Sequence, residues 1–170
     1  MRYAVLLFVF PVWALDSIPE TIEHAQAFAL KKDRKEACAT LNRALANTPS
    51  QIKARGKIVE TLNSLSKVFF TDKGQRLYES GQVNLFENPD LAVSQLREAQ
   101  NLEDENVLIL GQLARAQILK QDCSSALVTL EMARSLNPHL GELAVLELRA
   151  LMCAKRFDDF KEKMKSAFLP

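Results

Sequence analysis

Two sets of apolar residues in this chain are separated by a constant interval of 34 positions. Within each set the residues follow one another at spacings of three and four, so they share one face of a helix. The constant interval is typical of a repeated structural unit that buries its apolar face against the next unit. The chain is therefore expected to fold as a stack of similar helices. The matched residues are Ala92, Leu96, Ala99 and Leu102 in the first set and Ala126, Leu130, Ala133 and Leu136 in the second.

The composition agrees with a helical fold and argues against one class of partner. The 170 residues include only five glycines and six prolines, which favours helix over sheet. The 22 basic and 21 acidic residues give a formal charge of +1. A nucleic-acid-binding protein normally needs a basic face, so the charge gives no support for such a function. The length fits one ordinary domain.

The first residues have the order of a secretory signal. Arg2 supplies a positive start, residues 3–15 are uncharged and mostly apolar, and Ala14 provides a small residue for cleavage. This order predicts a signal peptide over residues 1–14. A permanent anchor is disfavoured because a membrane-spanning helix needs about 20 apolar residues. A buried first helix is the alternative, although residues 4–10 are apolar on every side.

Periodicity and turn signals predict about nine helices joined by short turns, with no segment that alternates as a strand should. Pro19 opens the first helix, residues 31–34 read as a polar turn, and Pro49 stops the second helix. Thr71 offers an N-cap for a helix that starts at Asp72. The later helices are expected over 91–102, 107–120, 122–136, 141–155 and 157–168.

The helix over residues 122–136 carries a specific arrangement: a small Ala, a large residue four positions on, Ala seven on and Pro twelve on. The same arrangement occurs earlier in the chain and resembles the second helix of tetratricopeptide (TPR) repeats, whose small residues let neighbouring helices approach closely. The matching residues are Ala126, Leu130, Ala133 and Pro138, and Ala37, Leu41, Ala44 and Pro49.

This resemblance implies an all-α, right-handed α-solenoid of stacked antiparallel helix pairs over residues 15–170. Repeat-like units are expected at 18–51, 73–106, 107–140 and 141–168. The match is imperfect, since Asp104 replaces the Pro in one unit and the large Phe160 stands where the last unit would have a small residue. Residues 52–72 lie outside the register. An extra or unusually long helix near 52–70 is therefore expected to brace the first unit against the others.

Two arginines follow the same interval, because Arg149 lies 34 positions after Arg115. The resemblance implies that they project at one height from consecutive first helices, on the concave side where such repeats hold ligands. Arg binds carboxylates bidentately, so a peptide C-terminus or an acidic segment is a candidate ligand. The alternative is that both arginines are solvated and paired with Glu142 or Glu147.

Four apolar residues would form the floor of this groove, unless they are used for packing between helices. They are Leu108, Leu119, Val145 and Met152.

Two of the three cysteines are expected to be neighbours. Cys123 lies at a turn between two helices and Cys153 near the end of the next first helix. In a stacked array of hairpins these places adjoin, so a disulfide is geometrically reasonable, and export would permit it. Alternatively, both are small buried apolar residues like Cys38.

No pattern of an active site, metal site or cofactor site is present. His24 and His139 are isolated, and the cysteine spacings do not fit zinc ligation. The acidic run 103–105 precedes a helix and reads as an N-terminal cap, where negative charge is favourable.

These observations predict a non-catalytic scaffold for protein–protein contacts, exported to a bacterial periplasm or cell envelope. Its expected partner is a protein or peptide, with no nucleic acid, no cofactor and no stable membrane span in the mature chain. Two other functions stay open. One is a carrier for a peptidoglycan or lipid-linked substrate, and the other is a non-catalytic subunit of an enzyme complex.

Overall fold

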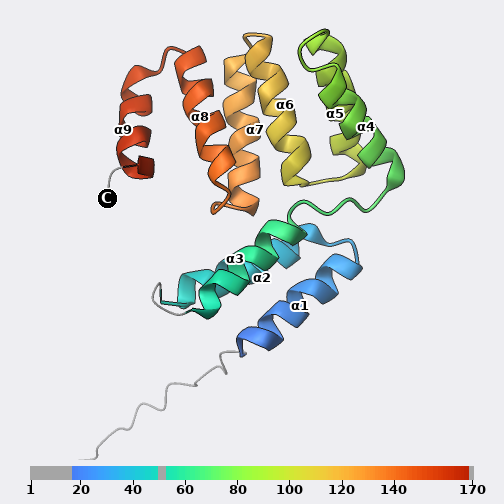
Figure 1. The fold of residues 1–170 in the computed structure, drawn as a ribbon, viewed down its shortest axis with the longest axis vertical. Helices are drawn as coiled ribbons and strands as arrows, with labels where there is room; N and C mark the ends of the chain where they lie inside the picture. Colours follow the sequence, from blue (N-terminus) through green and yellow to red (C-terminus); the bar gives the residue numbers. More distant parts are fainter. Residues whose placement is uncertain (1–16, 50–52, 169–170) are drawn as a thin grey trace, which may run out of the picture.

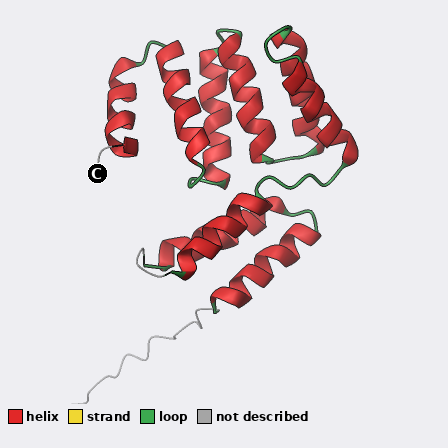
Figure 2. Ribbon diagram, in the orientation of Figure 1, coloured by secondary structure: helices red, strands yellow, loops and turns green. Residues whose placement is uncertain are grey.

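The computed structural model of the chain describes residues 17–49 and 53–168, and every regular element in these residues is a helix (Figures 1 and 2). The all-α prediction is confirmed. The predicted signal peptide over residues 1–14 lies outside the described residues. The nine helices of the described part are α1 (Ile18–Leu30), α2 (Arg34–Asn47), α3 (Ala54–Leu65), α4 (Asp72–Val83), α5 (Pro89–Leu102), α6 (Val107–Leu119), α7 (Cys123–Leu136), α8 (Gly141–Cys153) and α9 (Phe157–Phe168).

The helices from α4 to α9 form a row of antiparallel pairs (Figure 1). Each helix contacts the next one along the chain, and α6 also contacts both α4 and α8. This packing of each pair on the next is consistent with a solenoid. Helices α1 to α3 form a separate unit that lies beneath the lower ends of the helices of the row in Figure 1, and α2 touches α7.

The small and large residues of the repeated pattern are the residues that hold the row together. Ala92, Leu96 and Ala99 are fully buried, and so are their counterparts Ala126, Leu130 and Ala133. Alanine at these positions removes the bulk that would keep neighbouring helices apart, while leucine fills the space between them. The fourth positions differ, since Leu136 is buried and Leu102 is 40% exposed.

The apolar residues gather in three cores rather than one. One core joins α4, α5 and α6, a second joins α6, α7 and α8, and the third lies within α1, α2 and α3. Since the third core is separate, other contacts hold the N-terminal unit against the row.

The region expected to contain an additional helix does contain one, but α3 ends at Leu65 and does not extend to Phe70. The chain from 66 to 71 instead runs as a strap between α3 and α4, and its backbone groups bind other parts of the fold. The carbonyl of Ser66 accepts from the backbone N–H of Val107 at 3.0 Å, and the carbonyl of Val68 accepts from Arg34. These bonds replace the ones that a longer helix would make. At the end of the strap, Thr71 caps α4 as predicted, accepting from the Gly74 N–H.

Buried polar side chains join the N-terminal unit to the row, and we call this cluster the polar joint. Arg34 forms an ion pair of 2.9 Å with Glu103, and both side chains are almost fully buried. Asn137 donates to Asn63 at 2.8 Å and to Ser66 at 3.1 Å. The joint consists of Arg34, Asn63, Ser66, Thr71, Glu103, Asn106 and Asn137.

Two expectations from the sequence are wrong at this joint. Arg34, expected in the polar turn over 31–34, is instead the first residue of α2 and is only 2% exposed. Glu103 does not cap the following helix, whose N-cap is Asn106. Instead, the Glu103 carboxylate accepts from the Phe70 N–H, from Thr71 and from Arg34. Glu103 and Asn137 lie 34 positions apart, so equivalent places in successive units carry the joint.

Three turns share one backbone conformation. Lys32, Gln121 and Lys155 have φ values of 62°, 63° and 57°, in the left-handed region. In each turn the next residue donates its N–H back to the helix, and the three N–H to carbonyl bonds are Asp33 to Phe28 (3.0 Å), Asp122 to Gln117 (2.9 Å) and Arg156 to Leu151 (3.0 Å). This is the helix ending in which glycine is usually found at the left-handed position.

Glycine at these left-handed positions is expected to stabilise the protein. A non-glycine residue in this conformation costs about 1–2 kcal/mol. Glycine avoids this cost, but its greater freedom in the unfolded chain offsets part of the gain in stability. We expect Gln121→Gly to raise the free energy of unfolding by roughly 0.5–1 kcal/mol, measured by urea denaturation. The control is Lys120→Gly, at φ −78°, which should destabilise. Equal losses in both variants would contradict the prediction.

None of the helices in the described residues is long and apolar enough to cross a membrane.

Candidate functional site

A groove runs along the face formed by α6 and α8, and it consists of two adjoining hollows. The inner hollow, of about 190 Å³, lies between the α4–α5 turn, α6 and α8. The end hollow, of about 490 Å³, lies between α8 and α9. Ile118 and Arg149 line both hollows, so the groove is continuous.

Five of the six residues that the sequence suggested for a groove lie here. Arg115 and Leu119 line the inner hollow, Val145 and Met152 line the end hollow, and Arg149 lies between them. Leu108 is the exception. It is partly buried against the core of α4, α5 and α6, because it lies near the start of α6, away from both hollows.

The structure adds lining residues that the sequence did not indicate. Phe86 lines the inner hollow and is 76% exposed, while Phe160 and Met164 of α9 line the end hollow. A signal existed for the last two, since they lie 34 positions after Ala126 and Leu130. Phe86 carried no such signal. It lies in the turn between α4 and α5, which is longer than the turns that share the left-handed conformation.

The two arginines of the groove make no ion pair within the described part of the chain. Glu147, one of the suggested partners, binds Arg134 and Lys163 on the other side of α8 instead, with the Lys163 Nζ at 2.8 Å. Burial would raise the pKa of Glu147, but hydrogen bonds from Lys163 and Arg134 outweigh this and lower its pKa. The Glu147 carboxylate is thus committed elsewhere, and Glu142 forms no ion pair with either arginine among the described residues, although its charge acts on Tyr78 together with that of Arg115.

Buried polar atoms lie on α6 near the inner hollow. The Nε of Arg115 and the Oε1 of Gln112 are buried and find no hydrogen-bond partner among the described residues. Tyr78, 9% exposed, lies close by. Burial raises the pKa of the Tyr78 hydroxyl, while a hydrogen bond from Gln112 and the charge of Arg115 oppose the rise. A buried polar atom without a partner costs about 1–3 kcal/mol, and both atoms are closed to solvent, so a ligand in the hollow does not reach them.

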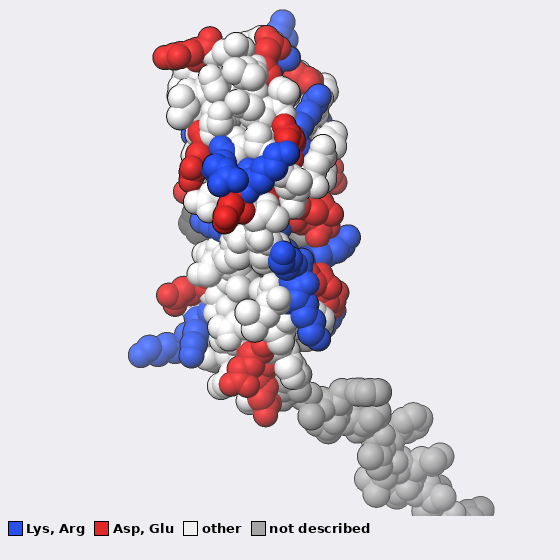
Figure 3. Space-filling view, turned by 90° about the vertical axis from the view of Figure 1, so that its right-hand side faces the viewer, with Lys and Arg blue, Asp and Glu red and all other residues white. Residues whose placement is uncertain are grey.

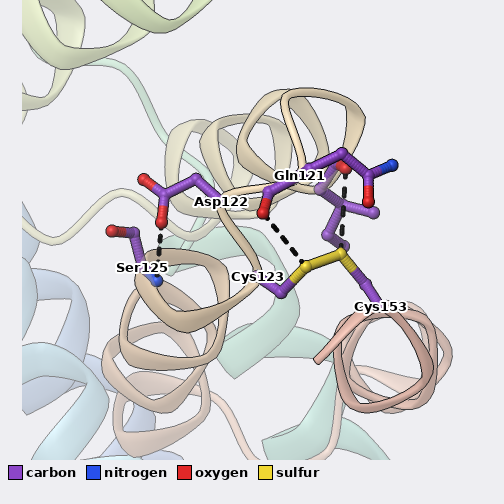
Figure 4. Close-up of a disulfide and its surroundings, with 6 residues drawn as sticks. Gln121, Asp122, Cys123, Ser125 and Cys153 are labelled. Carbon is purple, nitrogen blue, oxygen red and sulfur yellow. Dashed lines mark hydrogen bonds between the residues drawn. A yellow bond between two sulfur atoms is a disulfide. The ribbon is translucent and has the colours of Figure 1, made fainter. Parts of the chain in front are cut away.

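A disulfide joins α7 to α8 (Figure 4). It joins Cys123, the first residue of α7, to Cys153, the last residue of α8, with 5.7 Å between their Cα atoms. Cys153 follows Met152, so the bridge fixes the part of α8 that lines the end hollow. Cys38 is different, since it is a free, buried thiol whose pKa burial raises to about 11.

The other hollows differ in their lining, and one of about 590 Å³ lies between α1, the end of α3 and the strap. The hollow on the opposite side of α8 is lined by Arg134, Glu147 and Lys163, which are already paired. Figure 3 shows basic and acidic side chains interspersed with uncharged surface on a second face. Among the described residues, no three His, Cys, Asp or Glu side chains gather as a metal site would require.

Comparison with family models, with curated proteins and with solved structures gives no match for this chain. The function must therefore be argued from the groove and the fold that presents it.

Proposed function

We propose that this chain is a non-catalytic scaffold of the TPR type, a right-handed solenoid that binds a protein partner in the groove of α6 and α8. The observation that carries the proposal is the pair Arg115 and Arg149. Both guanidinium groups lie on an apolar hollow, and the described residues give neither an ion-pair partner.

The chemistry of the groove favours a partner with a carboxylate next to an apolar side chain. A guanidinium group matches the two oxygens of a carboxylate with parallel hydrogen bonds. The inner hollow can take an apolar side chain between Phe86, Leu119 and Leu146. An acidic segment or a free C-terminus of another protein meets both requirements.

We further propose that the protein is exported to a periplasm or cell envelope after cleavage of residues 1–14. The disulfide between Cys123 and Cys153 supports this proposal, because disulfides persist in oxidising compartments and are rare in the cytosol. The order of charge, apolar residues and small residues at the start of the sequence supports it as well.

The test is affinity capture by residues 15–170 from an envelope extract. We expect the double variant Arg115→Glu/Arg149→Glu to capture its partner at least tenfold less, equivalent to about 1.4 kcal/mol, because it replaces attraction with repulsion. The matched control is Arg76→Glu/Arg97→Glu, which makes the same charge change at exposed positions of α4 and α5. Unchanged capture by the groove variant would refute the proposal, and binding of cell-wall fragments alone would favour the carrier function.

A further inference from the structure

The end hollow has a template within the same molecule. Helix α8 packs on α6 and α7 through Leu143, Leu146 and Ala150, which share one core with residues of both helices. At Gly111 the approach is close, since a Cβ there would lie 3.9 Å from the side chains of Leu143 and Leu146. The surface that receives α8 consists of Gly111, Ala114 and Ile118 on α6 and Ala126 and Leu130 on α7.

The residues that lie 34 positions after these five all line the end hollow. They are Val145, Leu148 and Met152 on α8 and Phe160 and Met164 on α9. The α8/α9 pair therefore repeats the surface that holds α8, but no helix of the described chain lies on it. Val145 and Met152 are each 50% exposed and Met164 is 39% exposed.

Resting on the proposed function, we infer that the end hollow binds an amphipathic helix of a partner protein, which continues the stack as the next first helix. Leu143, Leu146 and Ala150 of α8 serve as the template for this helix and define positions i, i+3 and i+7. The partner helix therefore carries large apolar residues at i and i+3 and a small residue at i+7. At i+6, the position equivalent to that of Arg149 in α8, the partner helix carries an acidic residue. The carboxylate of that residue then pairs with the Arg149 side chain of this protein.

The first helix of a second copy of this chain does not fit the same site. The shared turn conformation aligns Lys32 with Lys155, so Leu143 and Leu146 correspond to Glu20 and Glu23 in α1. Both glutamates are exposed. Two carboxylates facing Leu148, Met152 and Met164 would lose their hydration without gaining partners. The outer face of α1 thus disfavours head-to-tail stacking of copies.

A synthetic peptide tests the inference directly. The probe is residues 140–153 of this chain with Arg149→Glu and Cys153→Ser, which has the required pattern, and its binding is measured by fluorescence polarisation. We expect the folded protein to bind it, and the double variant Met152→Glu/Met164→Glu to bind it at least tenfold more weakly. The same peptide with Leu143→Lys and Leu146→Lys should not bind.

The matched control variant is Val128→Glu/Met132→Glu. These residues of α7 are 60% and 41% exposed and lie outside both hollows, so they place the same charges on another apolar surface and should leave binding unchanged. No peptide binding, or binding that Met152→Glu/Met164→Glu leaves intact, overturns the inference. A concentration-dependent dimer of the wild type that this variant abolishes would identify a self-interface and overturn it as well.

The variant Arg115→Glu separates this inference from the proposed function, because Arg115 lines only the inner hollow. Loss of partner capture with Arg115→Glu but not with Met152→Glu/Met164→Glu would reject the helix site and keep the groove function. Peptide binding that depends on Met152 and Met164, with partner capture unaffected by Arg115→Glu, would keep the helix site and reject the inner hollow.

Discussion

Replacement of Glu103 by alanine is expected to lower the free energy of unfolding by about 3–5 kcal/mol, the usual cost of leaving a buried charge without its partner. Arg34 is 2% exposed and would lose the only carboxylate that it binds among the described residues. The N–H of Phe70, which now donates to Glu103 at 2.8 Å, would lose its acceptor as well. Urea denaturation at neutral pH measures the loss.

The size of this effect follows from how many parts of the fold meet at one carboxylate. Glu103 is the C-cap of α5, Phe70 and Thr71 of the strap donate to it, and Arg34 at the start of α2 pairs with it. Arg34 also lies over the ring of Phe70, with 4.3 Å between its Cζ and the ring centroid, and donates to the Val68 carbonyl. Loss of Glu103 therefore loosens the strap and the N-terminal unit together.

Two variants serve as controls for Glu103→Ala. Glu98→Ala removes the exposed pair with Lys73, which should cost no more than about 1 kcal/mol. The double variant Arg34→Met/Glu103→Leu removes both charges, and it should cost less than Glu103→Ala because no buried charge is left alone. A double variant that is as unstable as the sum of its single changes would show that the ion pair is not the source of the loss.

The loss should also depend on pH. Burial would raise the pKa of Glu103, but hydrogen bonds from the Phe70 N–H, Thr71 and Arg34 outweigh it and lower its pKa from the ordinary value of 4.5. Glu103 therefore binds a proton less tightly in the folded state than in the unfolded chain. The stabilisation that its carboxylate provides is fully present above pH 4.5. It disappears as the pH falls through the lowered pKa. The difference in unfolding free energy between wild type and Glu103→Gln should accordingly shrink in that acidic range.

The repeat was predictable from sequence because each unit's packing residues are local. Ala126, Leu130 and Ala133 lie within two turns of one helix, so their periodicity reveals the buried face without knowledge of the neighbour. The same register aligned Arg115 with Arg149 and placed five groove residues together. These predictions rest on one interval that the backbone itself repeats, as the turns at Gln121 and Lys155 show.

The polar joint was not predictable in this way, because its partners are distant in the chain. Glu103 and Arg34 are separated by 69 positions, and each looks like an ordinary surface residue beside a turn. Their burial depends on where the N-terminal unit docks, and no local pattern encodes that. The early end of α3 was not predictable for the same reason. Carbonyl groups of the strap accept hydrogen bonds from Arg34, Asn106 and Val107, which are distant in the chain, instead of from a further turn of α3.

Loss of the Cys123–Cys153 bridge is the other large effect that we expect. The bridge joins residues 30 positions apart, and a loop of this length predicts a loss of about 3–4 kcal/mol in unfolding free energy when it is opened. The physical reason is that the unfolded chain gains freedom once the loop is no longer closed. The measurement is urea denaturation of the wild type and of Cys123→Ser/Cys153→Ser, each with and without dithiothreitol.

Dithiothreitol should destabilise the wild type and leave the double variant unchanged. Cys38→Ala is the matched control, because it removes a buried thiol without removing a bridge and should stay sensitive to the reductant. Alkylation of the unfolded, unreduced protein should label one cysteine, Cys38, whereas labelling of all three would refute the bridge. Because Cys153 adjoins Met152, opening the bridge should also speed hydrogen exchange in the last turn of α8. Weaker binding of the helical peptide to the reduced protein would then follow from the loosened wall of the end hollow.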